Sequence, residues 1–201
     1  MIDNIPPGLI MILGALILPF LAQRTQAIAV LVLSLLSLFL FCLTGETSFG
    51  QMELFGATLE VVRIDATSRI FGIVFHIAAI VSAIYALHVR DTRQHVSGIV
   101  YAGAAIGACC AGDLLTLFVY WELTALSSVF LIWASDNERS YRAGMRYLII
   151  QVTSGVLLLS GAILRFVETG SLEFTKMAVQ GEPLSASAWL ILFAFGIKCA
   201  F

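Results

Sequence analysis

Charged residues are scarce in this chain. Asp, Glu, Lys and Arg together make up 12% of its 201 residues, and the formal net charge is -2. No basic stripe argues for nucleic-acid binding and no acidic tail argues for a solvated arm, so we expect no nucleic-acid partner. No Lys or Arg precedes the first apolar run, which excludes the basic segment of a cleaved signal peptide. We therefore expect the first apolar segment to remain in the protein.

Cysteine clusters and glycine-rich motifs are also lacking. The four cysteines lie inside apolar runs, without the spacing of a metal site, an iron–sulfur cluster or an extracellular disulfide framework. No Gly-rich dinucleotide loop is present. A lipid-embedded enzyme would need a nucleophile and a base grouped at an interface, and no such group occurs. We interpret the cysteines as packing residues and expect neither a cofactor nor a metal.

Hydrophobic residues dominate, at 60% of the chain, with 14 Phe and a mean hydropathy of +0.97. Many apolar runs approach the ~20 residues that cross a ~30 Å hydrocarbon layer as a helix. They lack the alternation of barrel strands. We predict an all-α membrane protein, a single domain over residues 1–201 in contact with lipid, with about seven transmembrane helices near 8–22, 27–43, 66–88, 96–112, 113–135, 143–166 and 185–201.

The longest polar connection, residues 44–65, contains Gly50 and Gly56 and two short runs of β-compatible residues. This pattern predicts a β-hairpin. The loops after odd-numbered runs hold six Arg residues, whereas the opposite loops hold four Lys or Arg. Because positive charge marks the cytoplasmic side, we expect the N-terminus and the hairpin outside the cytoplasm of a bacterial inner membrane.

Glu122 and Lys198 are ionisable residues well inside apolar runs. An ionised side chain at the centre of a membrane helix costs about 2.5–3.5 kcal/mol on insertion scales. Such residues usually face the bundle interior and mark an ion or proton path. Burial disfavours the charged form of both residues and each favours the charge of the other, so we predict that they approach one another and act as a proton switch. The alternative is a permanent ion pair that ties two helices together.

Three further polar residues are candidates for a relay. His76 lies in the middle of the third run, and an imidazole titrates near neutral pH. Gln151 and Ser154 share one face of the sixth run and could hold water near the path. All three could instead form ordinary hydrogen bonds between helices. Asp113, after Gly112, is expected to cap the fifth helix.

The last apolar run reaches Phe201 without a polar flank, which would leave a free carboxylate at membrane depth. We therefore expect these residues to be the N-terminal portion of a longer protein or one half of a split one.

Three motifs resemble those of a known family. The stretch Ala111-Gly-Asp-Leu-Leu-Thr-Leu-Phe-Val-Tyr-Trp-Glu is similar to the Gly-Asp-Leu...Phe...Glu helix of the antiporter-like subunits. Ile64-Asp-Ala-Thr-Ser-Arg-Ile-Phe and Phe195-Gly-Ile-Lys-Cys-Ala-Phe resemble the Asp-x-x-Ser and Gly-x-Lys helices of the same family. That family comprises the A and D subunits of Mrp-type cation/proton antiporters and the proton-pumping membrane subunits of respiratory complex I.

The resemblance implies the first repeat of an inverted-repeat antiporter-like fold, with Glu122 and Lys198 as the charge pair of proton translocation. It also implies other membrane subunits of a hetero-oligomeric complex as partners, and protons and Na+ as transported ions. A D-like Mrp subunit is the first choice. A complex I or membrane-bound hydrogenase subunit is the alternative, and a non-transporting scaffold is the second. The family's later Lys and the charged residue of its second repeat have no counterparts here.

Overall fold

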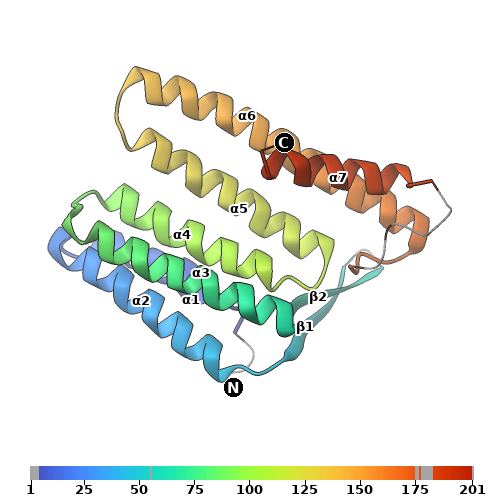
Figure 1. The fold of residues 1–201 in the computed structure, drawn as a ribbon, viewed down its shortest axis with the longest axis horizontal. Helices are drawn as coiled ribbons and strands as arrows, with labels where there is room; N and C mark the ends of the chain where they lie inside the picture. The colour runs from blue at the N-terminus through green and yellow to red at the C-terminus, as the bar shows by residue number, and fades with distance from the viewer. Residues whose placement is uncertain (1–4, 55, 175–176, 178–182, 201) are drawn as a thin grey trace.

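The computed structural model describes residues 5–54, 56–174, 177 and 183–200 (Figure 1). Short 3-10 turns follow two of the helices, at Leu18–Phe20 and Ala86–His88. The α-helices are α1 (Leu9–Ala15), α2 (Gln23–Leu43), α3 (Ala66–Tyr85), α4 (Thr92–Cys109), α5 (Leu114–Trp133), α6 (Glu138–Thr169) and α7 (Ala186–Lys198), and the strands are β1 (Thr47–Leu54) and β2 (Ala57–Ile64).

Each predicted apolar run contains a helix. Four of the described helices are long and apolar enough to cross a membrane: Gln23–Leu43, Ala66–His88, Leu114–Trp133 and Glu138–Thr169. The apolar segments Leu9–Phe20 and Ala186–Lys198 are shorter. A helical membrane protein is therefore confirmed, with a small sheet added, whereas seven crossings remain a prediction.

Polar caps define where most of the long helices begin. A side-chain oxygen at the N-cap accepts a hydrogen bond from a backbone N–H of the first turn, which would otherwise have no partner. Five helices start in this way, at Asp65, Asp91, Asp113, Asn137 and Ser185. α6 ends at Gly170, whose φ of 72° closes the helix in the left-handed region that glycine tolerates.

α5 packs between α4 and α6, and α7 lies against α6, whereas α1, α2 and α3 cluster around α4 (Figure 1). One buried cluster joins α5, α6 and α7 through Trp121, Leu158 and Ile191. A second buried cluster joins α1, α2 and α4 through Met11, Val30 and Ile99. α7 ends alongside the middle of α6 (Figure 1), and its last residue, Lys198, bonds Gln151 and Thr124 about half-way along α6 and α5.

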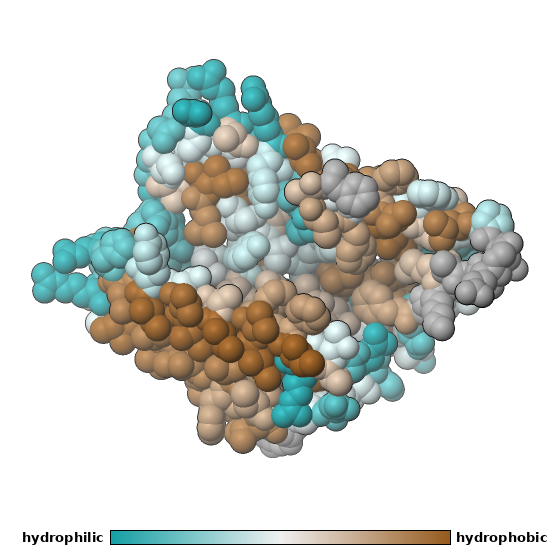
Figure 2. Space-filling model, viewed as in Figure 1, coloured by the Kyte–Doolittle hydropathy of each residue, from teal (hydrophilic) through white to brown (hydrophobic). Residues whose placement is uncertain are grey.

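The two ends of the bundle are polar and its flank is apolar. Figure 2 shows a hydrophobic band over α3, where Ile70, Val74, Ile77 and Val81 each expose half or more of their surface. Exposed apolar area of this extent is typical of a helix face that meets lipid or another protein. At one end, Arg93 forms hydrogen bonds with Asp136 that tie the start of α4 to the α5–α6 turn and hold the pKa of Asp136 below its usual range.

The predicted hairpin is present at the opposite end of the bundle. β1 and β2 pair antiparallel, from Thr47 opposite Ile64 to Leu54 opposite Ala57. Two hydrogen bonds fix β2 to the α4–α5 turn: Arg63 N–H donates to the Cys110 carbonyl at 2.8 Å, and Glu60 N–H donates to Asp113 Oδ2 at 3.1 Å. Its location outside the cytoplasm remains a prediction.

Candidate functional site

Lys198, the last residue of α7, directs its ammonium group into the contact between α5, α6 and α7. Its Nζ donates to Gln151 Oε1 at 3.0 Å, to Thr124 Oγ1 at 3.2 Å and to the Trp121 carbonyl at 3.3 Å. It also lies 4.9 Å from the centroid of the Trp121 ring, a cation–π distance. An ammonium has three N–H donors, so each can bond one of these acceptors, and all three acceptors are uncharged.

Glu122 follows Trp121 on α5 and points toward α6. Its Oε1 is buried and has no hydrogen-bond partner among the described residues. The carboxylate rests on Gly155, where a Cβ atom would collide with Oε1. The charges of Glu122 and Lys198 interact electrostatically, yet no ion pair closer than 4.0 Å joins these two residues. The geometry is therefore that of a separated pair, in which Lys198 is bound by dipoles and Glu122 lies near it.

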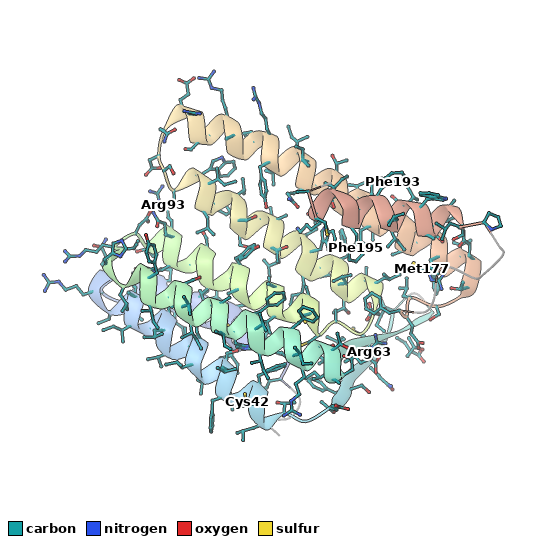
Figure 3. All side chains as sticks on the ribbon, in the orientation of Figure 1. Cys42, Arg63, Arg93, Met177, Phe193 and Phe195 are labelled. Atoms are coloured by element: carbon teal, nitrogen blue, oxygen red, sulfur yellow. The ribbon has the colours of Figure 1, made fainter. Side chains whose placement is uncertain are left out.

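Gln151 and Ser154, the predicted polar residues of α6, belong to the same cluster. Gln151 accepts from Lys198, and Ser154 Oγ donates to the Ala194 carbonyl of α7 at 2.9 Å and accepts from Trp121 Nε1 at 3.2 Å. Phe195 lies on the side of α7 that faces α5, where its ring meets Trp121 edge-on at 4.9 Å, whereas Phe193 points away (Figure 3). These contacts fix the Trp121 ring beneath the ammonium group.

Sequence reasoning missed Trp121, Thr124 and Gly155 as parts of this site. Thr124 stands three residues after Trp121 and shares its helix face, so recognising Trp121 would also have identified Thr124. The polar seam continues one turn further, where Ser128 and Tyr147 share a hydrogen bond of 2.8 Å. Ser128 follows Thr124 by four residues and Tyr147 precedes Gln151 by four, so both lie on the same α5–α6 interface.

His76 lies elsewhere, in the contact between α2 and α3. The ring is fully buried and stacks on Phe41 with centroids 5.1 Å apart. Nδ1 lies 2.7 Å from the Gly72 carbonyl, and Nε2 lies 2.9 Å from Ser37 Oγ. Since a carbonyl only accepts, Nδ1 donates, and Nε2 of the neutral ring accepts from Ser37. Within the described ranges no hydrogen bond links His76 to the Lys198 cluster, and its contacts are those of a bond between helices.

Residues 111–201 match the family model described as NADH:quinone oxidoreductase/Mrp antiporter, TM. The F(420)H(2) dehydrogenase subunit N of Methanosarcina mazei is 30% identical over 171 residues, 79% of this chain and 34% of the relative. The NADH-quinone oxidoreductase subunit N of Desulforudis audaxviator is 36% identical over 124 residues, 59% of this chain and 24% of the relative.

An antiporter subunit, mnhA2 of Staphylococcus haemolyticus, is 28% identical over 137 residues, 64% of this chain and 17% of the relative. The chain thus spans only 17 to 34% of the lengths of these three relatives. Relatives from the antiporter and the dehydrogenase branches match at similar identity, so the assignment to a D-like antiporter subunit stays a prediction.

Solved structures share the fold. A chain of the archaeal membrane-bound sulfane sulfur reductase superposes with a TM-score of 0.78 at 18% identity, covering 98% of this chain and 34% of the other. A chain of the Mrp complex from a Dietzia species gives 0.76 at 23% identity, covering 95% and 22%. A chain of respiratory complex I from Thermus thermophilus gives 0.75 at 19% identity, covering 100% and 43%. These structures show that the fold is shared, and the family model and the relatives place the chain in the antiporter-like membrane subunit family shared by Mrp antiporters and NADH:quinone oxidoreductases.

Proposed function

We propose that this chain carries part of the proton path of a membrane subunit in a multisubunit cation/proton antiporter, with Lys198 as the proton-carrying group and Glu122 as the charge that controls it. One observation carries the proposal. The Lys198 ammonium is held by three uncharged acceptors at half the depth of the bundle, while the Glu122 carboxylate lies near it without contact.

A separated pair is suited to switching because its energy depends on distance. At an effective dielectric constant of about 20, two unit charges attract by about 4 kcal/mol at 4 Å and by about 2 kcal/mol at 8 Å. The difference of about 2 kcal/mol corresponds to roughly a thirtyfold change in proton affinity. A movement of Glu122 toward Lys198 would therefore retain the proton, and a movement away would release it to a neighbouring acceptor.

The polar seam between α5 and α6 gives the proton a direction. Gln151 and Thr124 contact the ammonium group directly, and the Ser128–Tyr147 pair lies one turn nearer the α5–α6 turn. Hydroxyl groups donate and accept, so they can pass a proton, with water between them where the distances require it. We place the proton-exchanging end of this half of the path at the α5–α6 turn.

The partners in this proposal are other membrane subunits of a bacterial plasma-membrane complex, and the coupled ion is Na+. The alternative is a proton-pumping subunit of an NADH-quinone oxidoreductase or a related dehydrogenase, which the names of two relatives favour. Measurements of the pH gradient in everted vesicles that contain the full complex distinguish the antiporter from the oxidoreductase. Dissipation of a pH gradient by added Na+ supports the antiporter, whereas acidification driven by NADH supports the oxidoreductase.

The Glu122→Gln variant tests the role of the pair. It keeps the size of the side chain and removes its charge, so Lys198 should lose its controlling partner and transport should fall at least tenfold, the effect of ~1.4 kcal/mol. Glu138→Gln is the matched control, because Glu138 is an exposed residue of α6 paired only with Arg142 in the described chain. Transport is measured in everted vesicles with subunit levels checked in the same membranes. Equal transport at equal abundance would assign Glu122 a structural role and favour the scaffold alternative.

A further inference from the structure

A cavity lies between α3 and α4, away from the Lys198 cluster. Its volume is about 450 Å³. Met11, Val30 and Ile99 form a buried floor, whereas Phe75 and Tyr101 at its edge are 38% and 43% exposed. The cavity is therefore a groove that opens on the flank of the bundle.

Small residues create this groove. Ala79 and Ala83 of α3 and Gly98 and Ala102 of α4 all line it. Because none of them carries a side chain longer than a methyl group, space remains between the two helices where larger residues would close the contact. The lining is mainly apolar, so the space suits a hydrocarbon rather than a polar solute.

The groove has the length of one bilayer leaflet. Its lining runs from Phe75 of α3 to Ala86, the residue directly after this helix. Eleven helical steps of ~1.5 Å make this about 17 Å, close to half of the ~30 Å hydrocarbon layer. Its other lining residues include Gln94 near the start of α4 and Leu131 near the end of α5, so the groove belongs to the end of the bundle that carries Arg93 (Figure 3).

That end is rich in positive charge. Arg90 directly follows Val89, which lines the groove, and it is exposed. Arg93 is occupied by Asp91 and Asp136, whereas Arg90 has no ion pair with any described residue. Figure 2 shows hydrophilic side chains extending from this end beside the apolar band of α3. An apolar groove one leaflet long next to an arginine without an ion pair has the features of a binding site for an anionic phospholipid.

We propose that the α3–α4 groove binds one acyl chain of an anionic phospholipid, whose phosphate lies against Arg90. The lipid fills the space that the small residues leave and neutralises the arginine at the membrane surface. This inference does not depend on the proton path.

Native mass spectrometry of the full complex from nanodiscs tests the proposal, with phosphatidylglycerol and phosphatidylcholine as the probes. Ala79→Phe fills the groove and should remove one bound phosphatidylglycerol per subunit. Arg90→Gln should lower the preference for phosphatidylglycerol about fivefold, the effect of the ~1 kcal/mol that one arginine contributes near an anionic surface. The controls are Ile77→Phe, on the exposed face of α3 outside the groove, and Arg139→Gln, at the same end of the bundle.

Equal phosphatidylglycerol retention by wild type, Ala79→Phe and Arg90→Gln would overturn the proposal. Loss of a protein subunit from Ala79→Phe, with lipid unchanged, would also overturn it and assign the groove to a helix of a neighbouring segment. Equal retention of both lipids by wild type would reject the role of Arg90. Because Arg90 is exposed, its substitution tests the site even where Ala79→Phe fails to fold.

Discussion

Gly155 is the residue whose missing side chain sets the position of Glu122. Because a Cβ at this site would collide with Oε1, any side chain must displace the carboxylate or separate α5 from α6. Overpacking of this kind typically costs about 1–3 kcal/mol. We expect Gly155→Ala to lower the thermal stability of the protein and to reduce transport by its complex, because Glu122 no longer keeps its distance from Lys198. Thermal unfolding and pH-gradient dissipation measure the two effects.

Gly98→Ala is the control for this prediction. Its added Cβ meets no described atom within 4 Å, and helical Gly→Ala replacements stabilise by up to about 1 kcal/mol. Should Gly155→Ala be as stable and as active as Gly98→Ala, the close packing of Glu122 on α6 would have no functional weight.

His76 provides a second prediction at the scale of the residue. Ser37→Ala removes the partner of Nε2 inside a fully buried contact, and an unsatisfied buried acceptor costs about 1–3 kcal/mol. We expect lower thermal stability of the protein with unchanged transport per assembled subunit, because the bond joins α2 to α3 rather than reaching Lys198. Ser34→Ala is the control, since among the described residues Ser34 donates only to the Val30 carbonyl of its own helix. A large loss of transport at full assembly would restore His76 to the relay.

At the scale of the element, the junction of α4, α5 and the hairpin explains the Gly-Asp motif. Asp113 Oδ1 accepts from Thr116 N–H at 2.7 Å to cap α5, while Oδ2 accepts from Glu60 N–H of β2. At Gly112 a Cβ would collide with the Glu60 carbonyl, so only glycine lets the strand come this close. The position and depth of α5, and therefore of Glu122, are tied to the hairpin at this point.

Asp113→Ala should therefore be more destabilising than the loss of a cap alone. A lost cap costs about 0.5–2 kcal/mol, and the unpaired Glu60 N–H adds about 1–3 kcal/mol. The control is Asp65→Ala, because Asp65 is exposed and caps α3 through Ser68, with no hydrogen bond to another described element. Thermal unfolding measures the loss of stability of each variant relative to the wild type. Equal losses of stability would show that the contact with β2 contributes nothing.

At the scale of the whole molecule, the side of the membrane on which each end lies is open to test. Ser48 of β1 and Ser140 of α6 are at opposite ends of the bundle (Figure 1). From the distribution of Arg residues we expect an impermeant thiol reagent to label Ser48→Cys in intact cells and Ser140→Cys only after permeabilisation, both in a cysteine-free background. The reverse pattern would invert the topology.

The lipid surroundings, the helices and the two notable ionisable residues could all be predicted from the amino-acid sequence. Its apolar runs specify helices because backbone groups in lipid must bond within their own segment, and each run does contain a helix. The cap at Asp113 follows from local geometry, and Glu122 and Lys198 stand out because charge is costly in lipid. Each of these inferences needs only residues that are near one another in the chain.

Which residues contact one another became known from the packing of the folded chain. Gln151 and Ser154 could have faced any helix, yet Gln151 bonds Lys198, and Ser154 bonds Trp121 and Ala194. His76 is likewise a polar residue inside an apolar run, but it bonds Ser37 on α2. Periodicity gives the face of a helix but not the rotation and depth at which two helices pack, which depend on side-chain volumes such as the absent one at Gly155. The separation of Glu122 from Lys198 depends on that packing, so only the folded structure could fix it.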